Sequence, residues 1–269
     1  VSLDKMGFDP DTIRLWKKAY SSGNGIVLVT GPTGSGKSTT LYATLTRINT
    51  VEEHIITIED PVERQLEGII QGHVNERAGM TFAAALRSML RQDPDVIMVG
   101  EMRDRETADL AIRAALTGHL VFSTLHTNSA AASYTRLADM GCDPFLLTTT
   151  IRAILAQRLI RKLCDRCKVK YRPTEKDLKS IGLKQLDGFI YHANSKGCKS
   201  CGKDGYRGRA GLYELLVPNE EINEAVKNEA SAEEVSRIAK NNKMRMLVDA
   251  ARTYVTQGLT SVEEINRVL

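Results

Sequence analysis

Residues 31–38 combine glycines, a lysine and a serine in the spacing of a phosphate-binding loop. The run Gly-Pro-Thr-Gly-Ser-Gly-Lys-Ser fits the pattern G-x-x-x-x-G-K-[ST] and lies between a predicted strand and a predicted helix. Glycines let backbone N–H groups point at phosphate oxygens, and the helix N-terminus adds partial positive charge. Lys37 would reach the β- and γ-phosphates, and Ser38 would hold Mg²⁺. The alternative is a glycine-rich turn that binds nothing. The expected nucleotide-binding residues are Gly31, Pro32, Thr33, Gly34, Ser35, Gly36, Lys37, Ser38 and Thr39.

Carboxylates follow two of the predicted strands. Glu59 ends the strand predicted over 54–59, and Glu101 comes after the strand predicted over 95–99. The carboxyl ends of parallel strands meet at one sheet edge, where acidic residues place Mg²⁺ or an attacking water. Solvated loop acids are the competing interpretation. The Glu101 segment is the weaker signal, because Gly100 stands where a common metal-binding pattern has Asp.

Two histidines bracket the strand predicted over 120–125. His119 precedes this strand and His126 follows it. Histidine senses or orients phosphate at neutral pH. A lone histidine at a strand end is more often structural, so both interpretations stay open at this point.

Four of the five cysteines form two C-x-x-C pairs, Cys164/Cys167 and Cys198/Cys201. Four thiolates are the ligand set of a closed structural zinc site. Reduced free thiols and an opportunistic disulfide are the alternatives, and Cys142 is expected to have no role. Cations around the pairs would offset the negative charge of a zinc–thiolate centre. These cations are Arg158, Arg161, Lys162, Arg166, Lys168, Lys170, Arg172, Lys196, Lys199, Lys203, Arg207 and Arg209.

The residues around these motifs alternate between strand and helix patterns. The strands are continuous apolar runs, which predicts an α/β fold with a mostly parallel sheet covered on both faces. Asp9, Thr81 and Asp104 are the expected helix N-caps. Strands are expected over 26–30, 54–59, 69–74, 95–99 and 120–125, and helices over 8–22, 39–48, 81–91 and 104–117.

Strand patterns become weak after about Ser129, and helical patterns replace them. A second helical stretch is expected after Gly211. We therefore expect three parts. The α/β domain would span 1–163, a four-cysteine metal-binding subdomain 164–205, and a C-terminal helical region 206–269.

The composition is that of an ordinary globular domain. Of 269 residues, 42% are hydrophobic and 26% charged, which excludes a disordered chain or a coiled-coil rod. No apolar run approaches the ~18–20 residues of a membrane helix, and no signal peptide is visible. The net charge of +4 is too small to indicate nucleic-acid binding. The chain begins with Val1, so a truncated protein with missing N-terminal domains is expected.

Four motifs in order resemble the GspE/PilB family, the ATPases of type II secretion and type IV pilus assembly. They are the phosphate-binding loop, the run Ile56–Glu63 (similar to an Asp box), the run Leu90–Glu101 (similar to a Walker B segment) and the run Thr117–Asn128 (similar to a His box). The resemblance covers essentially the whole chain, the cysteine module included. It implies a RecA-like P-loop NTPase domain that hydrolyses ATP.

The resemblance also implies roles for single residues. Glu101 would polarise the attacking water, and Glu59 would assist near the γ-phosphate and the metal. His126 and His119 would couple the phosphate state to subunit position. Arg87, Arg91 and Arg103 lie where the family carries arginines that bind a neighbouring subunit's nucleotide. From the sequence alone, a solvated helix face is the better explanation of Arg87 and Arg91.

Assembly and partners are implied in the same way. The family forms hexamers that act on an inner-membrane platform protein and a cytoplasmic adaptor, so we expect a cytoplasmic chain attached peripherally through partners. ATP, Mg²⁺ and Zn²⁺ are the implied cofactors, and the cysteine module argues against pilus retraction. Nucleic acid is not an expected partner. Two alternatives remain, a RecA-like nucleic-acid motor and a nucleotide-gated interaction module with little hydrolysis.

Overall fold

The computed structural model describes residues 1–269 and divides them into two compact units. The first unit comprises Val1–Ala156 and Leu215–Met244, and the second comprises Gln157–Glu214 and Arg245–Leu269. The boundaries expected at 163/164 and 205/206 are a finer division and stay a prediction. No helix combines the length and the apolar character needed to cross a membrane.

A seven-stranded sheet is the frame of the fold, with strand order β3-β2-β4-β5-β1-β6-β9. Strands β1 to β5 pair in parallel, and β6 pairs in parallel with β1. Every residue of β1, β2, β4 and β5 is buried, as continuous apolar runs require. The expected mostly parallel α/β sheet is therefore confirmed. The strands are β1 (Gly25–Thr30), β2 (Ile55–Glu59), β3 (Ile70–His73), β4 (Val96–Val99), β5 (Leu120–Leu125), β6 (Ile151–Leu163), β7 (Val169–Tyr171), β8 (Ile190–His192) and β9 (Tyr206–Leu216).

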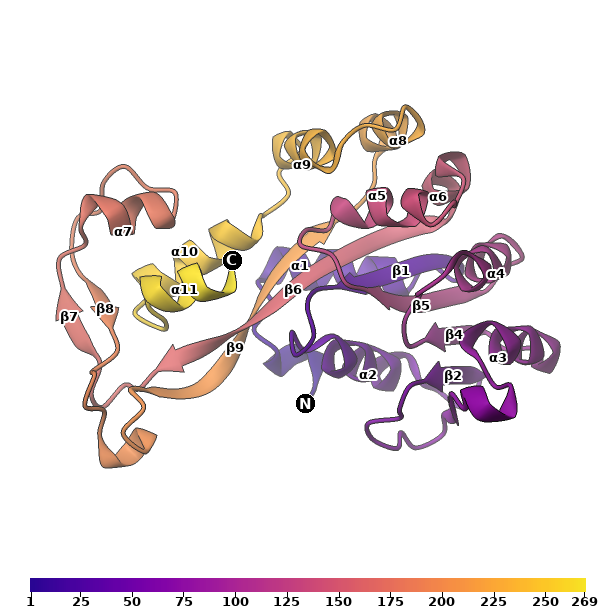
Figure 1. Ribbon diagram of the computed structural model, residues 1–269, viewed down its shortest axis with the longest axis horizontal. Coiled ribbons are helices and arrows are strands. Elements are labelled where there is room, and N and C mark those ends of the chain that lie inside the picture. Colours follow the sequence, from indigo (N-terminus) through magenta and orange to yellow (C-terminus); the bar gives the residue numbers. More distant parts are fainter. The chain divides into compact units, whose positions relative to one another are not determined.

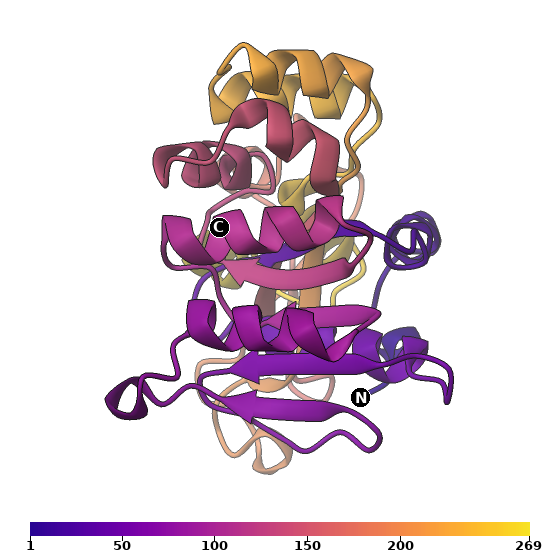
Figure 2. The same ribbon diagram turned by 90° about the vertical axis from the view of Figure 1, so that its right-hand side faces the viewer.

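Helices cover both faces of the sheet in the first unit. Figure 1 shows α3 and α4 to the right of the sheet and α2 to its left, and Figure 2 turns α3 and α4 towards the viewer. The side chains of Asp9, Thr81 and Asp104 cap α1, α3 and α4, as expected. The helices of this unit are α1 (Pro10–Tyr20), α2 (Lys37–Ile48), α3 (Phe82–Met89), α4 (Arg105–Leu116), α5 (Ala132–Asp139), α6 (Pro144–Thr150), α8 (Glu220–Lys227) and α9 (Ala232–Asn241), with short 3₁₀ turns η1 (Leu3–Lys5), η2 (Glu76–Ala78) and η3 (Leu90–Gln92).

The expectation that helices take over after about Ser129 is wrong for two long strands. Ile151–Leu163 forms β6, although its Leu, Arg, Gln and Lys residues are good helix formers. Its backbone pairs with β1, and that pairing overrides local propensity. Tyr206–Leu216 forms β9, so the chain becomes helical only from α8 onwards.

The second unit carries the four cysteines. A two-stranded antiparallel sheet of β7 and β8 lies between the two cysteine pairs in the sequence, and α7 connects its strands. Two helices complete the unit. The elements not yet given are α7 (Glu175–Ser180), η4 (Lys199–Cys201), α10 (Leu247–Thr256) and α11 (Val262–Val268).

The buried carboxylate of Glu264 on α11 forms hydrogen bonds with Arg161 of β6 within this unit. Glu264 is 1% exposed and accepts hydrogen bonds from the Arg161 backbone N–H at 2.8 Å and from the Arg161 guanidinium at 2.9 Å. Arg267 donates a further bond at 2.6 Å. Burial alone would raise the pKa of Glu264, but the hydrogen bonds from Arg267 and Arg161 outweigh it and lower the pKa to about 2.

We expect Glu264 to make the second unit sensitive to acid. A carboxyl group whose pKa is depressed by folding stabilises the fold above its ordinary pKa, and that stabilisation is lost as the pH falls from about 4.5 towards 2. The shift corresponds to about 3 kcal/mol at neutral pH. Glu264→Gln should therefore lower the urea midpoint at neutral pH, and its difference from wild type should shrink on acidification. The exposed neighbour Glu263→Gln is the control, and a difference that does not change with pH would contradict the prediction.

Candidate active site

The phosphate-binding loop joins the end of β1 to the start of α2. Gly34 and Gly36 have φ angles of 79° and 88°, which favour glycine and turn the backbone amides inwards. Lys37, the first residue of α2, donates from Nζ to the carbonyl oxygens of Gly31 at 2.8 Å and Pro32 at 3.1 Å. The lysine is therefore held over its own loop, at the position where phosphate oxygens would bind.

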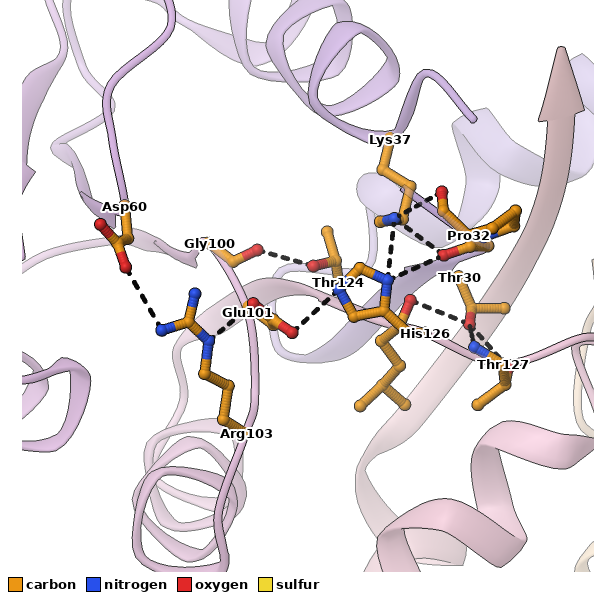
Figure 3. Close-up of polar contacts among 12 residues, drawn as sticks. Thr30, Pro32, Lys37, Asp60, Gly100, Glu101, Arg103, Thr124, His126 and Thr127 are labelled. Atoms are coloured by element: carbon orange, nitrogen blue, oxygen red, sulfur yellow. Dashed lines mark hydrogen bonds and ion pairs between the residues drawn. The ribbon is translucent and has the colours of Figure 1, made fainter. Parts of the chain in front are cut away.

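His126 connects this lysine to Glu101. The Nε2 atom of His126 lies 2.9 Å from Glu101 Oε1, and its Nδ1 atom lies 3.4 Å from Lys37 Nζ (Figure 3). With the proton on Nε2, the imidazole donates to Glu101, while Nδ1 faces both Lys37 Nζ and the Gly31 carbonyl oxygen, which is 3.2 Å away. The segments after β4 and β5 and the start of α2 thus bring Glu101, His126 and Lys37 into one continuous series of contacts.

Arg103 extends the series to a second carboxylate. Its Nε donates to Glu101 Oε2 at 2.8 Å, and its Nη1 lies 3.2 Å from Asp60 Oδ2 (Figure 3). The hydrogen bond to Glu101 raises the pKa of Arg103 above its ordinary value. Thr124 holds the segment that follows β4 and carries Glu101, because its hydroxyl donates to the Gly100 carbonyl at 2.6 Å.

Glu59 is the most buried of the site carboxylates, at 4% exposed. Its Oε2 accepts hydrogen bonds from Thr57 at 2.6 Å and Gln71 at 3.1 Å, and its Oε1 accepts one from the Tyr42 hydroxyl. Burial and this hydrogen bond raise the pKa of Tyr42 to about 12. The carboxylate is therefore oriented from three sides at the end of β2.

A cavity of about 70 Å³ separates α2 from the acidic strand ends. Its polar lining is mostly hydroxyl groups and carboxylates, the hard oxygen ligands that Mg²⁺ prefers, and apolar side chains such as Leu41 and Phe82 complete it. The donor set therefore fits a magnesium ion. The polar side chains of the lining are Ser38, Glu59, Asp60, Glu63, Glu101, Arg103 and Thr124.

Three predicted site residues lie elsewhere. His119 is at the opposite end of β5 from His126, about 20 Å away along the strand. Its Nδ1 lies 2.9 Å from the Ala114 carbonyl oxygen, so it caps the last turn of α4. Arg87 on α3 forms an ion pair with Glu106, and Arg91 is exposed on η3. The structure brings none of the three into the site of its own chain.

The sequence motifs do not indicate the residues that orient the carboxylates and the loop. Asp60 and Thr57 lie in the run 56–63 without an expected role, and Tyr42 and Gln71 lie outside all four motifs. Tyr42 follows Ser38 by one helical turn, a spacing that places both on one face of α2. The contribution of Gln71 depends on the pairing of β3 with β2, for which the sequence offers no signal.

The four-cysteine cluster has the dimensions of a tetrahedral metal site. Its sulfur atoms all lie within 4.8 Å of one another, and the Cys164–Cys198, Cys167–Cys201 and Cys198–Cys201 pairs are 3.8 Å apart. A tetrahedron with Zn–S bonds of about 2.3 Å has edges of about 3.8 Å. A disulfide would need about 2.05 Å. The arrangement therefore fits zinc and does not fit a disulfide.

The backbone around the cluster favours thiolate at one cysteine. The N–H groups of Cys198 and Gly205 both donate to Cys201 Sγ at 3.2 Å and lower its pKa to about 6. Tight turns bring each pair together, with Cys167 N donating to Cys164 O at 3.2 Å and Cys201 N to Cys198 O at 3.3 Å. This backbone geometry presents the two C-x-x-C turns to each other.

Comparison with known proteins shows which protein family this chain resembles in sequence. The Type II/IV secretion system protein family model matches residues 1–267. Type II secretion system protein E of Pseudomonas aeruginosa is 48% identical over 268 residues, covering 100% of this chain and 53% of that protein. The type IV pilus assembly ATPase PilB of Thermus thermophilus is 46% identical, covering 98% of this chain and 30% of that protein.

Solved structures agree on the fold. A crystal structure of the pilus retraction motor PilT with bound ADP has a TM-score of 0.73 and 32% identity, covering 99% of this chain and 66% of that one. The ATPase DotB of Legionella pneumophila has a TM-score of 0.70 and 27% identity, covering 99% of this chain and 64% of that one. The sheet and its helices thus have the RecA-like arrangement of these ATPases. The chain spans about half the length of the curated type II secretion relatives it matches. It belongs to the type II/IV secretion system protein family.

Proposed function

We propose that this chain carries the ATP-hydrolysing site of a hexameric motor that drives assembly of a type IV pilus or a type II secretion pseudopilus. One observation supports the proposal most, the continuous contacts from Lys37 through His126 to Glu101. They connect the loop that would hold the phosphates to the carboxylate that would activate water. The names of the relatives agree with such a motor.

Each site residue has a distinct part in this reaction. Lys37 neutralises charge on the β- and γ-phosphates, and Glu101 orients the attacking water. Because His126 donates to one Glu101 oxygen and Arg103 to the other, the carboxylate is oriented before ATP binds. When bound, Mg²⁺ neutralises charge on the phosphate oxygens, and Ser38 and Glu59 are among the residues that would hold it.

The arginines distant from this site would serve a neighbouring subunit. Arg87 and Arg91 are exposed and lie outside the contact series, which fits a contribution to another chain's nucleotide. Arg103 belongs to the site itself and would reach a neighbouring subunit's nucleotide only after release from Glu101 and Asp60. We assign phosphate coupling to His126, and His119 holds the end of α4.

The motor would act on an inner-membrane platform protein with a cytoplasmic adaptor, and its membrane contact would be peripheral, through these partners. Zn²⁺ in the four-cysteine cluster would be structural. A nucleotide-gated module with little hydrolysis is the second candidate, because the chain matches only part of its relatives. Comparing ATP turnover of this chain with that of the full-length protein separates the two.

We expect Lys37→Ala in the full-length protein to lower ATP turnover by about 10²–10³-fold, because it removes a fixed cation from the developing charge. Phosphate release measured with malachite green reports the effect. Lys17→Ala is the matched control, since Lys17 is an exposed lysine on α1. Full turnover in Lys37→Ala would overturn the proposed function.

A further inference from the structure

A cluster of hydroxyl groups joins the phosphate-binding loop to the segment after His126. Thr30, the last residue of β1, directly precedes the loop, and Thr127 directly follows His126. The Thr127 N–H donates to Thr30 Oγ1 at 2.9 Å, and the two hydroxyl oxygens are 2.6 Å apart. Figure 3 shows this pair beside His126. The loop and the histidine are thus attached to each other at their adjoining residues.

The same cluster continues into α5. The Thr127 hydroxyl donates to the Ser129 carbonyl at 2.9 Å and lies 3.2 Å from Ser133 Oγ, in the first turn of the helix. A hydroxyl group has one proton and two lone pairs. The Thr127 hydroxyl has three oxygen neighbours, and the Thr30 hydroxyl also lies 3.1 Å from the Leu125 carbonyl oxygen, so the pair is connected to the end of β5 as well. Thr30 and Ser133 are 0% exposed, so these bonds are shielded from water and their loss is costly.

Helix α5 has room to respond to a movement at its start. A cavity of about 140 Å³ lies beside it, lined by Tyr134 and Ala138 of α5, Leu147 of α6 and Val226 of α8. The Tyr134 hydroxyl is buried without a hydrogen-bond partner. The cavity leaves space beside α5, next to the neighbouring helices α6 and α8.

We propose that Thr127 is a positioning residue that couples nucleotide in the loop to the position of α5. The inference rests on the proposed function, since it takes a nucleoside triphosphate as the ligand. A displacement of Thr30 or His126 when phosphate binds is passed by the Thr127 hydroxyl to Ser133. The helix then moves against the cavity lined by α6 and α8.

Hydrogen exchange of the full-length protein tests this coupling. A non-hydrolysable ATP analogue with Mg²⁺ should slow exchange at residues 31–39 and change it at residues 132–139. In Thr127→Val, which keeps the side-chain shape but loses the hydroxyl, the change over 132–139 should fall about tenfold. Thr127→Ser restores the hydroxyl and should restore the change. Thr50→Val, an exposed threonine just after α2, should behave as wild type.

The possible outcomes separate the coupling from the function on which it rests. If wild type binds no analogue and residues 31–39 stay unprotected, the proposed function fails. If residues 31–39 are protected but 132–139 do not change, or Thr127→Val keeps the full change, the coupling is wrong. If Thr127→Val is unfolded, Thr30→Val removes the hydroxyl contact from its other end. Loss of the change over 132–139 in Thr30→Val would then support the coupling, and a full change would contradict it.

Discussion

Glu101→Gln should lower ATP turnover by about 10²–10⁴-fold while nucleotide binding persists, because the carboxylate acts on the attacking water and the loop holds the phosphates. Glutamine keeps the size of the side chain and an oxygen that accepts from His126. It removes the negative charge that Arg103 and His126 orient. Turnover measured by phosphate release, and binding measured with a fluorescent ATP analogue, report the two steps separately.

The control for this substitution is Glu76→Gln. Glu76 is exposed on η2 and has no contact with the residues of the candidate site, so turnover should stay at the wild-type value. Equal loss of binding and turnover in Glu101→Gln would show that the residue supports the loop and not the water. Unchanged turnover would show that Glu101 takes no part in ATP hydrolysis.

The second large effect concerns the cysteine cluster. Elemental analysis should find one zinc per chain, and Cys198→Ser should abolish it together with the ordered structure of the second unit. Structural zinc sites bind with about 10–16 kcal/mol at neutral pH, and that free energy is folding free energy. Circular dichroism and protease sensitivity, with and without a strong chelator, measure the loss of structure.

Cys142→Ala is the matched control for the thiol substitution. Cys142 is buried in the first unit, and burial raises its pKa to about 11, so it is a weak metal ligand. Its replacement should leave the zinc content unchanged. A protein with no zinc, four titratable thiols in the cluster and an unchanged fold would contradict the assignment.

Motifs of consecutive residues were the part of the site that the sequence could predict. Residues 31–38 are adjacent along the chain, and their glycines dictate a loop between strand and helix wherever it lies. Glu59 and Glu101 were expected at one sheet edge because both end apolar strands. They do line one cavity, since β2 and β4 are neighbours in the sheet.

Contacts between distant segments could not be predicted in the same way. The Arg103–Asp60 pair and the Thr30–Thr127 bridge depend on strand order and register, which the sheet as a whole decides. The distance of His119 from the site also depends on the fold, because β5 lies between the two histidines. A strand that begins at one sheet edge and ends at the other separates the two histidines that the sequence shows as a pair.

The paired C-x-x-C turns have a practical consequence for handling this protein. They close a loop whose two ends are held together, so the segment between them is anchored independently of its length. Lengthening a closed loop is inexpensive, about 0.6 kcal/mol for each doubling. Residues 184–188, between α7 and β8, are largely exposed and outside both elements. A fluorescent label or an epitope inserted there would report on the second unit.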